Sequence, residues 1–329
     1  MESRIGWISI ANDSFGSTRI GVTNIHKALV NRGIFSMILN YNKKFHTDID
    51  KDYVELKNEI LQNRLTCVVF HKVCGPKAVK LAEFCVDQNI NCVYCNGDWH
   101  ENQMYDIADQ IIVGSPYIKE ILDERYNVKG IHYIDDALEF LGDIKIHFDV
   151  PEINMCWYGN FTKLEYARDY INSLELPDNY KLTTVSNAPC EYTNLEADIT
   201  MGAATGKPWD TLKLSKYILE EVDIVVVPID LSDGDPRKTF AKTANRITFA
   251  MSLGVPVVAT PIPTYQLVIQ DKFNGYLCQY KEQWQEALTE LGSAKKRNRI
   301  SGISIDDIRT KYDINNIIKK WIPILCLED

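Results

Sequence analysis

The chain has 329 residues, which is long for one compact core and sufficient for two domains of about 150 residues each. Hydrophobic residues make up 45% of it and charged residues 25%, which excludes wholesale disorder. A formal net charge of −9 and a pI near 5.3 argue against a surface that wraps nucleic acid, so we expect no extended nucleic-acid binding.

The first half of the chain alternates β-rich runs with helical stretches. We expect strands at 5–10, 34–39, 66–70, 91–94, 110–113 and 131–134. Helices are expected between them at 18–32, 52–63, 76–88 and 116–126. This alternation is typical of a parallel sheet with crossover helices.

The second half repeats the pattern. Expected strands are 155–158, 181–185, 223–227, 255–259 and 276–278, and expected helices are 163–173, 210–220, 242–253, 264–270, 281–292 and 304–327. Two such halves predict an α/β protein with two doubly wound, Rossmann-like domains, joined near 138–152. Ligands of such sheets bind outside the carboxyl ends of the strands, so we expect the site in a cleft between the two domains.

Cysteines and the N-terminus indicate the compartment. The nine cysteines are odd in number and most lie in apolar runs, as free thiols do in reducing compartments. Cys92 and Cys95 have metal-like spacing but lack a second Cys or His pair, so no zinc site is expected. The chain enters a strand without a charged and apolar leader, and no apolar run approaches 18 residues, so we predict a cytoplasmic protein.

Cations gather in the loop after the expected strand at 223–227. Arg237, Lys238, Lys242 and Arg246 surround the start of a helix expected near Lys242. Free N–H groups at a helix start, together with the helix dipole, attract anions, and neighbouring cations strengthen binding of a diphosphate. The alternative is a basic region without a ligand, in which Thr243 or Asn245 only caps the helix.

The same block carries a family resemblance. Lys242-Thr-x-Asn-Arg246, followed by Ala250-Met-x-x-Gly254-x-Pro256-Val-Val-Ala259, resembles the donor-site block of GT-B fold glycosyltransferases of the group 1 type. Four further segments resemble features of that family in the family's order: Ser17-Thr-Arg19 with the helix after it, Gly114-Ser115-Pro116, Trp157-Tyr-Gly159-Asn160 and Asn274-Gly-Tyr-Leu277. Together they span nearly the whole chain.

The resemblance implies roles for these residues. The donor phosphates would be bound by Lys242, Thr243, Asn245, Arg246, Arg237 and Lys238, and the nucleotide would lie near Gly159 and Asn160. Gly16, Ser17 and Arg19 would form an acceptor-side or phosphate loop. It implies an acceptor-side domain at 1–145, a nucleotide-sugar domain at 146–311, and a helix at 312–329 that crosses back to the first domain.

One feature departs from the family. Its donor block usually carries two glutamates eight positions apart, where this chain has Ala241 and Phe249. A related subset with Lys-Ser/Thr-x-Asn-Arg also lacks the pair. Asp230, Asp233 or Asp235 are alternative acceptors for sugar hydroxyls, although a charged turn explains at least two of them.

A last cluster follows two neighbouring expected strands. His71 and Lys72 end the strand at 66–70, and Asp98 and His100 follow the strand at 91–94. Adjacent parallel strands open on one edge, so these groups are expected to converge. His100 is the nearest match to a family histidine that touches the transferred sugar, and Asp98 is the candidate to orient it or to accept the acceptor's proton. The alternative is that Asp98 caps a helix and His100 is a surface residue.

These observations predict a transferase that moves a sugar from a nucleotide-diphosphate sugar to a glycan or lipid-linked acceptor, in polysaccharide or glycoconjugate biosynthesis. No cofactor and no metal are expected, because Asp233-Gly-Asp235 lies in a loop already rich in cations. The resemblance implies retention of anomeric configuration. A non-catalytic nucleotide-sugar-binding protein and a sugar-nucleotide epimerase stay open as alternatives. The basic stretch Lys295, Lys296, Arg297 and Arg299 is expected to be a solvated helix face, with contact to anionic lipids at the membrane's inner face left open.

Overall fold

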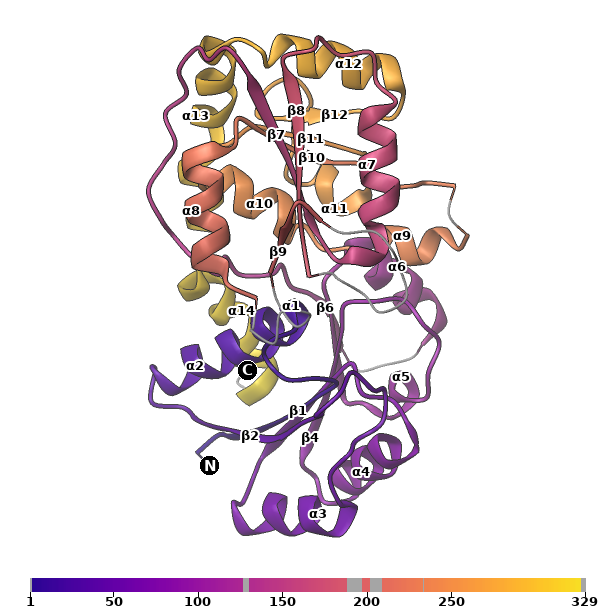
Figure 1. The fold of residues 1–329 in the computed structure, drawn as a ribbon. Coiled ribbons are helices and arrows are strands. Elements are labelled where there is room, and N and C mark those ends of the chain that lie inside the picture. The colour runs from indigo at the N-terminus through magenta and orange to yellow at the C-terminus, as the bar shows by residue number, and fades with distance from the viewer. Residues whose placement is uncertain (1, 127–129, 188–196, 202–208, 233, 327–329) are drawn as a thin grey trace. The chain divides into compact units, whose positions relative to one another are not determined.

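The computed structural model describes residues 2–126, 130–187, 197–201, 209–232 and 234–326. The chain divides into two compact units. The first contains Met1–Ala137, Phe240–Thr243 and Asp313–Asp329, and the second contains Leu138–Thr239 and Ala244–Tyr312. Each unit is built on a six-stranded sheet with parallel strand pairings, which confirms the predicted α/β class (Figure 1).

The sheet of the first unit has the strand order β2-β1-β3-β4-β5-β6. The strands are β1 (Arg4–Ser9), β2 (Phe35–Tyr41), β3 (Cys67–His71), β4 (Asn91–Asn96), β5 (Gln110–Val113) and β6 (Gly130–Tyr133). The central strands β3 and β4 are buried along their length, as expected for strands covered on both faces. Their register places Ser9 beside His71 and His71 beside Cys95, so three carboxyl ends meet at one edge.

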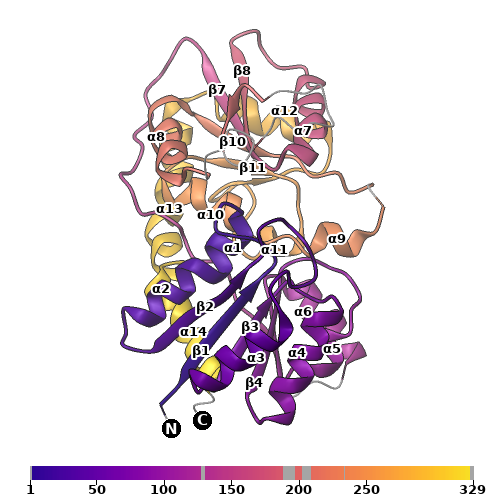
Figure 2. The same ribbon diagram turned by 60° about the horizontal axis from the view of Figure 1, so that its bottom comes forward.

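Helices cover both faces of this sheet (Figure 2). One face packs against α3 (Tyr53–Gln62), α4 (Pro76–Asp87), α5 (Met104–Ile107) and α6 (Pro116–Arg125). The other packs against α2 (Asn24–Val30) and α14 (Ile314–Cys326). Local signals place the helix starts: Asp52 accepts hydrogen bonds from two N–H groups of α3, and α4 and α6 each begin with a proline.

The C-terminal helix α14 completes the core of the first unit. The ring of Trp321 lies 5.9 Å from that of Trp7 on β1, and the Asn91 side chain donates a 2.8 Å hydrogen bond to the Ile324 carbonyl. The expected return of this helix to the first domain is therefore confirmed. The single helix expected at 304–327 is wrong, because the Asp313 carboxylate accepts the Asn315 N–H and starts a new helix after α13 (Ala294–Lys311).

A conservative change in α14 tests this packing. Ile317 is fully buried against the sheet, and Ile317→Val removes one methylene that the surrounding core cannot replace. We expect the free energy of unfolding to fall by about 0.5–1.5 kcal/mol, measured by urea denaturation. Ile322→Val, at a half-buried position of the same helix, is the matched control and should cost less. Equal decreases in the free energy of unfolding for the two variants would show that Ile317 is not a main packing contact between α14 and the sheet.

The sheet of the second unit has the order β12-β11-β10-β7-β8-β9. Its strands are β7 (Ile153–Gly159), β8 (Tyr180–Ser186), β9 (Ile199–Thr200), β10 (Ile224–Val227), β11 (Val257–Ala259) and β12 (Tyr276–Leu277). α7 (Leu164–Asn172) and α12 (Lys281–Glu290) pack on one face around Trp284, and α8 (Thr211–Glu221) and α10 (Asn245–Ser252) lie on the other (Figure 1). Short helices complete the unit: η2 (Phe161–Lys163), α9 (Pro236–Phe240) and α11 (Pro263–Gln266).

The segment 138–150, where the sequence predicted the linker, is bound to the second unit along its length. The Arg309 guanidinium donates to the Gly142 and Asp143 carbonyls, and Arg297 donates to the Phe148 carbonyl at 2.8 Å. Arg297 is fully buried, which corrects the expectation that its basic stretch is a solvated face throughout. A buried guanidinium needs such acceptors, and the linker carbonyl is one of them.

Candidate functional site

The carboxyl edge of the first sheet brings Lys72 and Asp98 together. The Lys72 ammonium lies 2.7 Å from an Asp98 carboxylate oxygen, which joins the ends of β3 and β4. Lys72 adopts a left-handed backbone conformation with φ of +59°, and its amide donates to the Cys95 carbonyl. This conformation is costly for a residue with a side chain, and such strain is found at functional sites.

The Lys72 ammonium lies close to Gly97 and is almost buried. A Cβ atom on Gly97 would lie 3.7 Å from Nζ of Lys72, an ordinary contact distance, so the lysine does not require glycine at this position. Lys72 is only 9% exposed, and a lysine this buried requires a paired carboxylate. Its partner Asp98 is mostly exposed, so the carboxylate is the member of the pair that faces solvent.

The charges around Asp98 set its chemistry. Lys72 is the main cause of a pKa lowered from the ordinary value of 3.8, and Lys242 and His100 act in the same direction against partial burial. Asp98 is therefore ionised throughout the neutral range, and its basicity is reduced. A weak base is a poor proton acceptor, so the geometry favours a fixed negative charge over the alternative of general base.

His71 is placed in the interior. Its Nδ1 lies 2.9 Å from Oγ of Ser9, which in turn lies 3.1 Å from the hydroxyl of Thr18. Burial, with Lys72 beside it, lowers the pKa of His71 to about 3, so the ring is neutral. A Cβ on Gly21 would lie 3.4 Å from Nε2 of His71. His71 thus connects β1, β3 and the helical segment after β1.

His100 is half-buried and contacts a thiol. Its Nε2 lies 3.3 Å from Sγ of Cys74, and burial is the main cause that lowers its pKa from 6.5, with Asp98 opposing and Lys72 assisting. The ring is therefore neutral at pH 7, with one nitrogen held by the sulfur. Sequence reasoning missed Cys74, because a cysteine in the loop after β3 carries no pattern that marks such a contact.

The predicted loop Gly16–Arg19 forms the first turns of a helix. Gly16 and Ser17 begin α1 (Gly16–Thr18), and Arg19 begins a π-helical segment, η1 (Arg19–Thr23). A Cβ on Gly16 would approach only the Arg19 guanidinium, at 3.7 Å, so no protein contact requires glycine there. π-Helical turns occur often at functional sites. Gly16, Ser17 and Arg19 all keep partial exposure at this sheet edge.

The start of the predicted phosphate block belongs to the first unit. The Ser115 hydroxyl donates a 2.7 Å hydrogen bond to the Phe240 carbonyl, and the Phe240 ring packs edge-on against Tyr117. A Cβ on Gly114 would meet the Thr243 methyl at 2.5 Å. These contacts tie residues 240–243 to the first unit, and the helix expected to begin near Lys242 instead begins at Asn245 as α10.

Gly159 and Arg246 meet in the second unit. A Cβ on Gly159, at the end of β7, would lie 3.2 Å from Nη1 of Arg246 and 3.0 Å from the Trp157 ring. Tyr158 fixes the same turn by donating its hydroxyl to the Arg246 carbonyl. Arg246 is partly exposed. The second unit therefore places a guanidinium beside a glycine at the carboxyl end of a central strand, where such sheets bind ligands.

Most of the other residues predicted to bind the donor have structural roles within the second unit. Asn160 caps η2 by accepting the Thr162 N–H, and Asn245 is the first residue of α10. Arg237 pairs with the Asp235 carboxylate at 2.9 Å, and Lys238 is exposed on α9. Next to this cap, the Asn187 side chain accepts the Phe161 N–H. Asp233, one of the alternative acceptors for sugar hydroxyls, lies outside the described residues.

Apolar packing explains the two missing glutamates. Ala241 is buried in the core cluster of the first unit. Phe249 is 7% exposed, and its ring lies 6.2 Å from that of Tyr158 in an edge-on contact. A carboxylate at either position would be buried among hydrophobic groups, which is unfavourable without a partner. The two positions have become part of the cores.

Two negative findings concern the described residues only. No helix there is both long and apolar enough to cross a bilayer. Among the same residues, no three His, Cys, Asp or Glu side chains gather in a way that would hold a metal ion. Metal independence stays a prediction.

A small substitution tests the Gly159–Arg246 arrangement. Gly159→Ala introduces a methyl group 3.2 Å from the guanidinium and should displace it. We expect affinity for a nucleotide-diphosphate sugar to fall about fivefold, or roughly 1 kcal/mol, in isothermal titration. Gly302→Ala, in α13 with open space around the position, is the control and should leave affinity unchanged. Unchanged affinity in Gly159→Ala would remove Gly159 from the site.

Comparisons with known proteins identify solved structures that share this chain's architecture. No protein-family model matches the sequence, and no curated protein matches it. Solved structures do match. The apo form of the lipopolysaccharide outer core galactosyltransferase WaaB superimposes with a TM-score of 0.64 at 12% identity, over 98% of this chain and 99% of that chain. Sucrose-phosphate synthase from Thermosynechococcus elongatus gives 0.64 at 13%, over 97% of both chains.

A third structure is similar over its full length. Anabaena HepE, in complex with UDP and glucose, superimposes with a TM-score of 0.64 at 13% identity, over 99% of this chain and 100% of that chain. At such identities the likeness establishes architecture, and it does so along nearly the entire chain. The protein has the fold of the GT-B glycosyltransferases.

Proposed function

We propose that this protein is a glycosyltransferase that moves a sugar from a nucleotide-diphosphate sugar to a glycan or lipid-linked acceptor. The observation that carries the proposal is the Arg246 guanidinium beside Gly159 at the carboxyl end of β7, in a GT-B fold. A partly exposed guanidinium next to a glycine backbone suits a charged group such as a phosphate, because it can donate two parallel hydrogen bonds.

The donor side follows from the charge that develops during transfer. Cleavage of the bond between the anomeric carbon and phosphate leaves a nucleotide diphosphate with extra negative charge. In the second unit Arg246 and the N-terminus of α10 at Asn245 would stabilise that charge. Lys242 and Thr243 stay candidate phosphate ligands, with Arg237 and Lys238 as weaker ones since Arg237 already pairs with Asp235. UDP is the first nucleotide to test, because HepE was solved with UDP and glucose.

In the first unit Lys72, Asp98 and His100 form the candidate reaction site. Ionised Asp98 would accept hydrogen bonds from sugar hydroxyls, and neutral His100 would contact the transferred sugar. Gly16, Ser17, Arg19 and His71 would shape the neighbouring loop. We propose a retaining and metal-independent reaction. NMR of the product's anomeric proton tests the first statement, and turnover in excess EDTA tests the second.

Phe249 favours a second candidate, a non-catalytic nucleotide-sugar-binding protein. Its ring packs against Tyr158 at a position where the family usually has a glutamate. Such a protein would bind the donor but would neither hydrolyse nor transfer it.

A donor screen followed by product analysis separates these candidates. UDP-sugars are screened by thermal shift, since a ligand at 100 times its dissociation constant adds about 2.7 kcal/mol of stability. The stabilising donor is then incubated with the protein and a panel of saccharide acceptors, and products are weighed by mass spectrometry. A glycosylated product or released UDP supports a transferase. Binding without either product supports the second candidate, and an isomer of unchanged mass indicates an epimerase.

The proposed reaction also suggests a location. Nucleotide-diphosphate sugars and a lipid-linked acceptor would meet in the cytoplasm at the inner face of a membrane, and we propose that location for the protein. Fractionation of cells that express the tagged chain tests it.

A further inference from the structure

An exposed row of apolar side chains lies on segment 138–150. Ile144, Ile146, Phe148 and Val150 are exposed by 45%, 68%, 71% and 40%, and we call these four side chains the linker strip. Most other exposed large apolar residues in the described part of the chain are scattered singly, which is ordinary. Four at alternate positions form a contiguous surface, and such surfaces mark interactions.

The linker strip is held in place by the residues between its members. In an extended segment alternate side chains point to opposite faces. His147 points inward and is 3% exposed, with Nε2 2.9 Å from the Gly254 carbonyl and Nδ1 3.3 Å from Nε of Arg297. The Lys145 amide donates to the Leu253 carbonyl. The outward direction of the strip is therefore fixed by buried hydrogen bonds on the opposite face.

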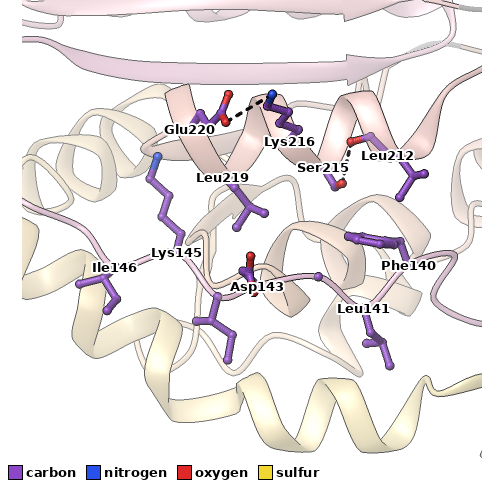
Figure 3. Close-up of a pocket in the computed structure, with 12 residues that line it drawn as sticks. Phe140, Leu141, Asp143, Lys145, Ile146, Leu212, Ser215, Lys216, Leu219 and Glu220 are labelled. Carbon is purple, nitrogen blue, oxygen red and sulfur yellow. Dashed lines mark hydrogen bonds and ion pairs between the residues drawn. The ribbon is translucent and has the colours of Figure 1, made fainter.

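Helix α8 extends the apolar surface. An open cavity of about 830 Å³ lies between α8 and residues 140–146 (Figure 3). Leu219 points from α8 into this space, while Leu141 and Ile146 point away from α8 (Figure 3). Leu212 of α8 is 61% exposed and Leu141 is 47% exposed. The same cavity is also lined by Asp143, Lys145, Lys216 and Glu220, so both apolar and charged groups adjoin the linker strip.

Exposed cations flank the strip. The first turns of α13 bind the segment directly, because the Ala294 N–H donates to Asp149 and the Asn298 amide donates to the His147 carbonyl. Lys295 and Arg299 are exposed on these turns. The structure gives these two cations no ion pair among the described residues, whereas the nearby Asp149 carboxylate is engaged by α13.

We infer that the linker strip docks this protein on an anionic lipid bilayer, with Ile146 and Phe148 inserted at the headgroup level and Lys295 and Arg299 facing lipid phosphates. Apolar side chains flanked by cations are the combination that binds anionic interfaces. A second copy of the chain fits less well, because it would bring the same cations together, and one row of side chains is narrow beside the roughly 800 Å² per partner of a stable interface. The inference does not depend on the proposed transferase activity.

Vesicle flotation tests the inference. The full chain is mixed at low salt with vesicles of phosphatidylcholine, or of phosphatidylcholine with 30% phosphatidylglycerol (about one lipid in three, so that each cation meets an anion). We expect at least tenfold stronger partitioning to the anionic vesicles. Ile146→Ser/Phe148→Ser should reduce it about tenfold or more, and Lys295→Glu/Arg299→Glu should reduce it similarly and weaken its dependence on salt.

A matched variant controls for the loss of apolar surface. Phe45 and Val54 belong to the first unit and are exposed by 55% and 60%, so Phe45→Ser/Val54→Ser removes apolar exposed side chains that are not part of the strip. It should partition like the unmodified chain. The altered side chains are exposed, and circular dichroism checks that each variant is folded. Failure of the unmodified chain to bind anionic vesicles overturns the inference. So does unchanged binding by Ile146→Ser/Phe148→Ser, or a dimer that this variant dissociates without any vesicle binding.

Discussion

Arg246→Ala is expected to weaken binding of a UDP-sugar about 100-fold, or roughly 2.7 kcal/mol. Arg246 places its guanidinium next to Gly159 at the end of β7, where a bound diphosphate would receive two charge-assisted hydrogen bonds. Each such bond contributes about 1.5–3 kcal/mol, so the expected loss lies near the lower end of the range for two bonds. The loss should appear in isothermal titration with UDP as well as with the sugar nucleotide, because the diphosphate is common to both.

Two further variants test whether the loss of affinity is specific to the guanidinium of Arg246. Arg246→Lys keeps the charge but loses the planar fork, so we expect it to recover only part of the affinity. Lys213→Ala removes an exposed cation of α8 in the same unit and should leave affinity unchanged. If Arg246→Ala binds UDP as tightly as the unmodified protein, the phosphate site proposed for the second unit is wrong.

Lys72→Met is expected to lower kcat about 100-fold or more while the affinity for UDP stays within a few fold. The variant leaves Asp98 without its 2.7 Å partner and removes the cation that most lowers its pKa. Lys72 also lowers the pKa of His100. Both pKa values should rise in the variant, so the acid limb of the kcat–pH profile should move to higher pH.

The acid limb moves to higher pH because Lys72 lowers both pKa values in the unmodified protein. In the unmodified protein Asp98 has a pKa below 3.8, so it keeps its charge as the pH falls from 8 to 5. Without Lys72 the pKa of this carboxylate rises, so the carboxylate protonates at a higher pH than in the unmodified protein. Asp98→Asn should lower kcat by a similar factor, and the double variant should lose little more, because the two residues act as one pair.

A lysine elsewhere in the first unit serves as the control. Lys80→Met, on the exposed face of α4, should keep both kcat and the acid limb. If the loss of kcat in the double variant equals the combined losses of Lys72→Met and Asp98→Asn, the two residues do not act as one pair. Full turnover by Asp98→Asn would remove Asp98 from the reaction, whether as a base or as a fixed charge.

Periodicity in the sequence predicted most of the fold. Eleven of the strands were placed within a few residues, because apolar β-branched runs such as Ile224–Val227 have only one favourable environment in a doubly wound sheet. The missed strand, Ile199–Thr200, has two residues and no pattern of its own. The division between α13 and α14 was missed because the apolar spacing continues across Tyr312, while the Asp313 cap that separates them is a single side chain.

The candidate site was less predictable, since its contacts join distant segments. Strand order predicted that loops after β3 and β4 would share an edge, and Lys72 and Asp98 do meet there. Nothing in the sequence indicated that Phe240 would bind Ser115, which delays the start of α10 to Asn245. The start of α10 depends on tertiary packing between segments 125 positions apart in the chain. Local helix propensity does not include such contacts.

Helix α14 has a consequence for synthesis of the chain. Trp7 is translated long before its partner Trp321, which emerges only after the entire second unit has been made. Until then one side of the first sheet, including Ile5 and Val69, has no cover from α14 and would expose apolar surface that favours aggregation. A nascent chain of this design should therefore engage chaperones for longer than one whose amino-terminal half is self-contained. A stop codon placed ahead of Ile314 should yield an insoluble product.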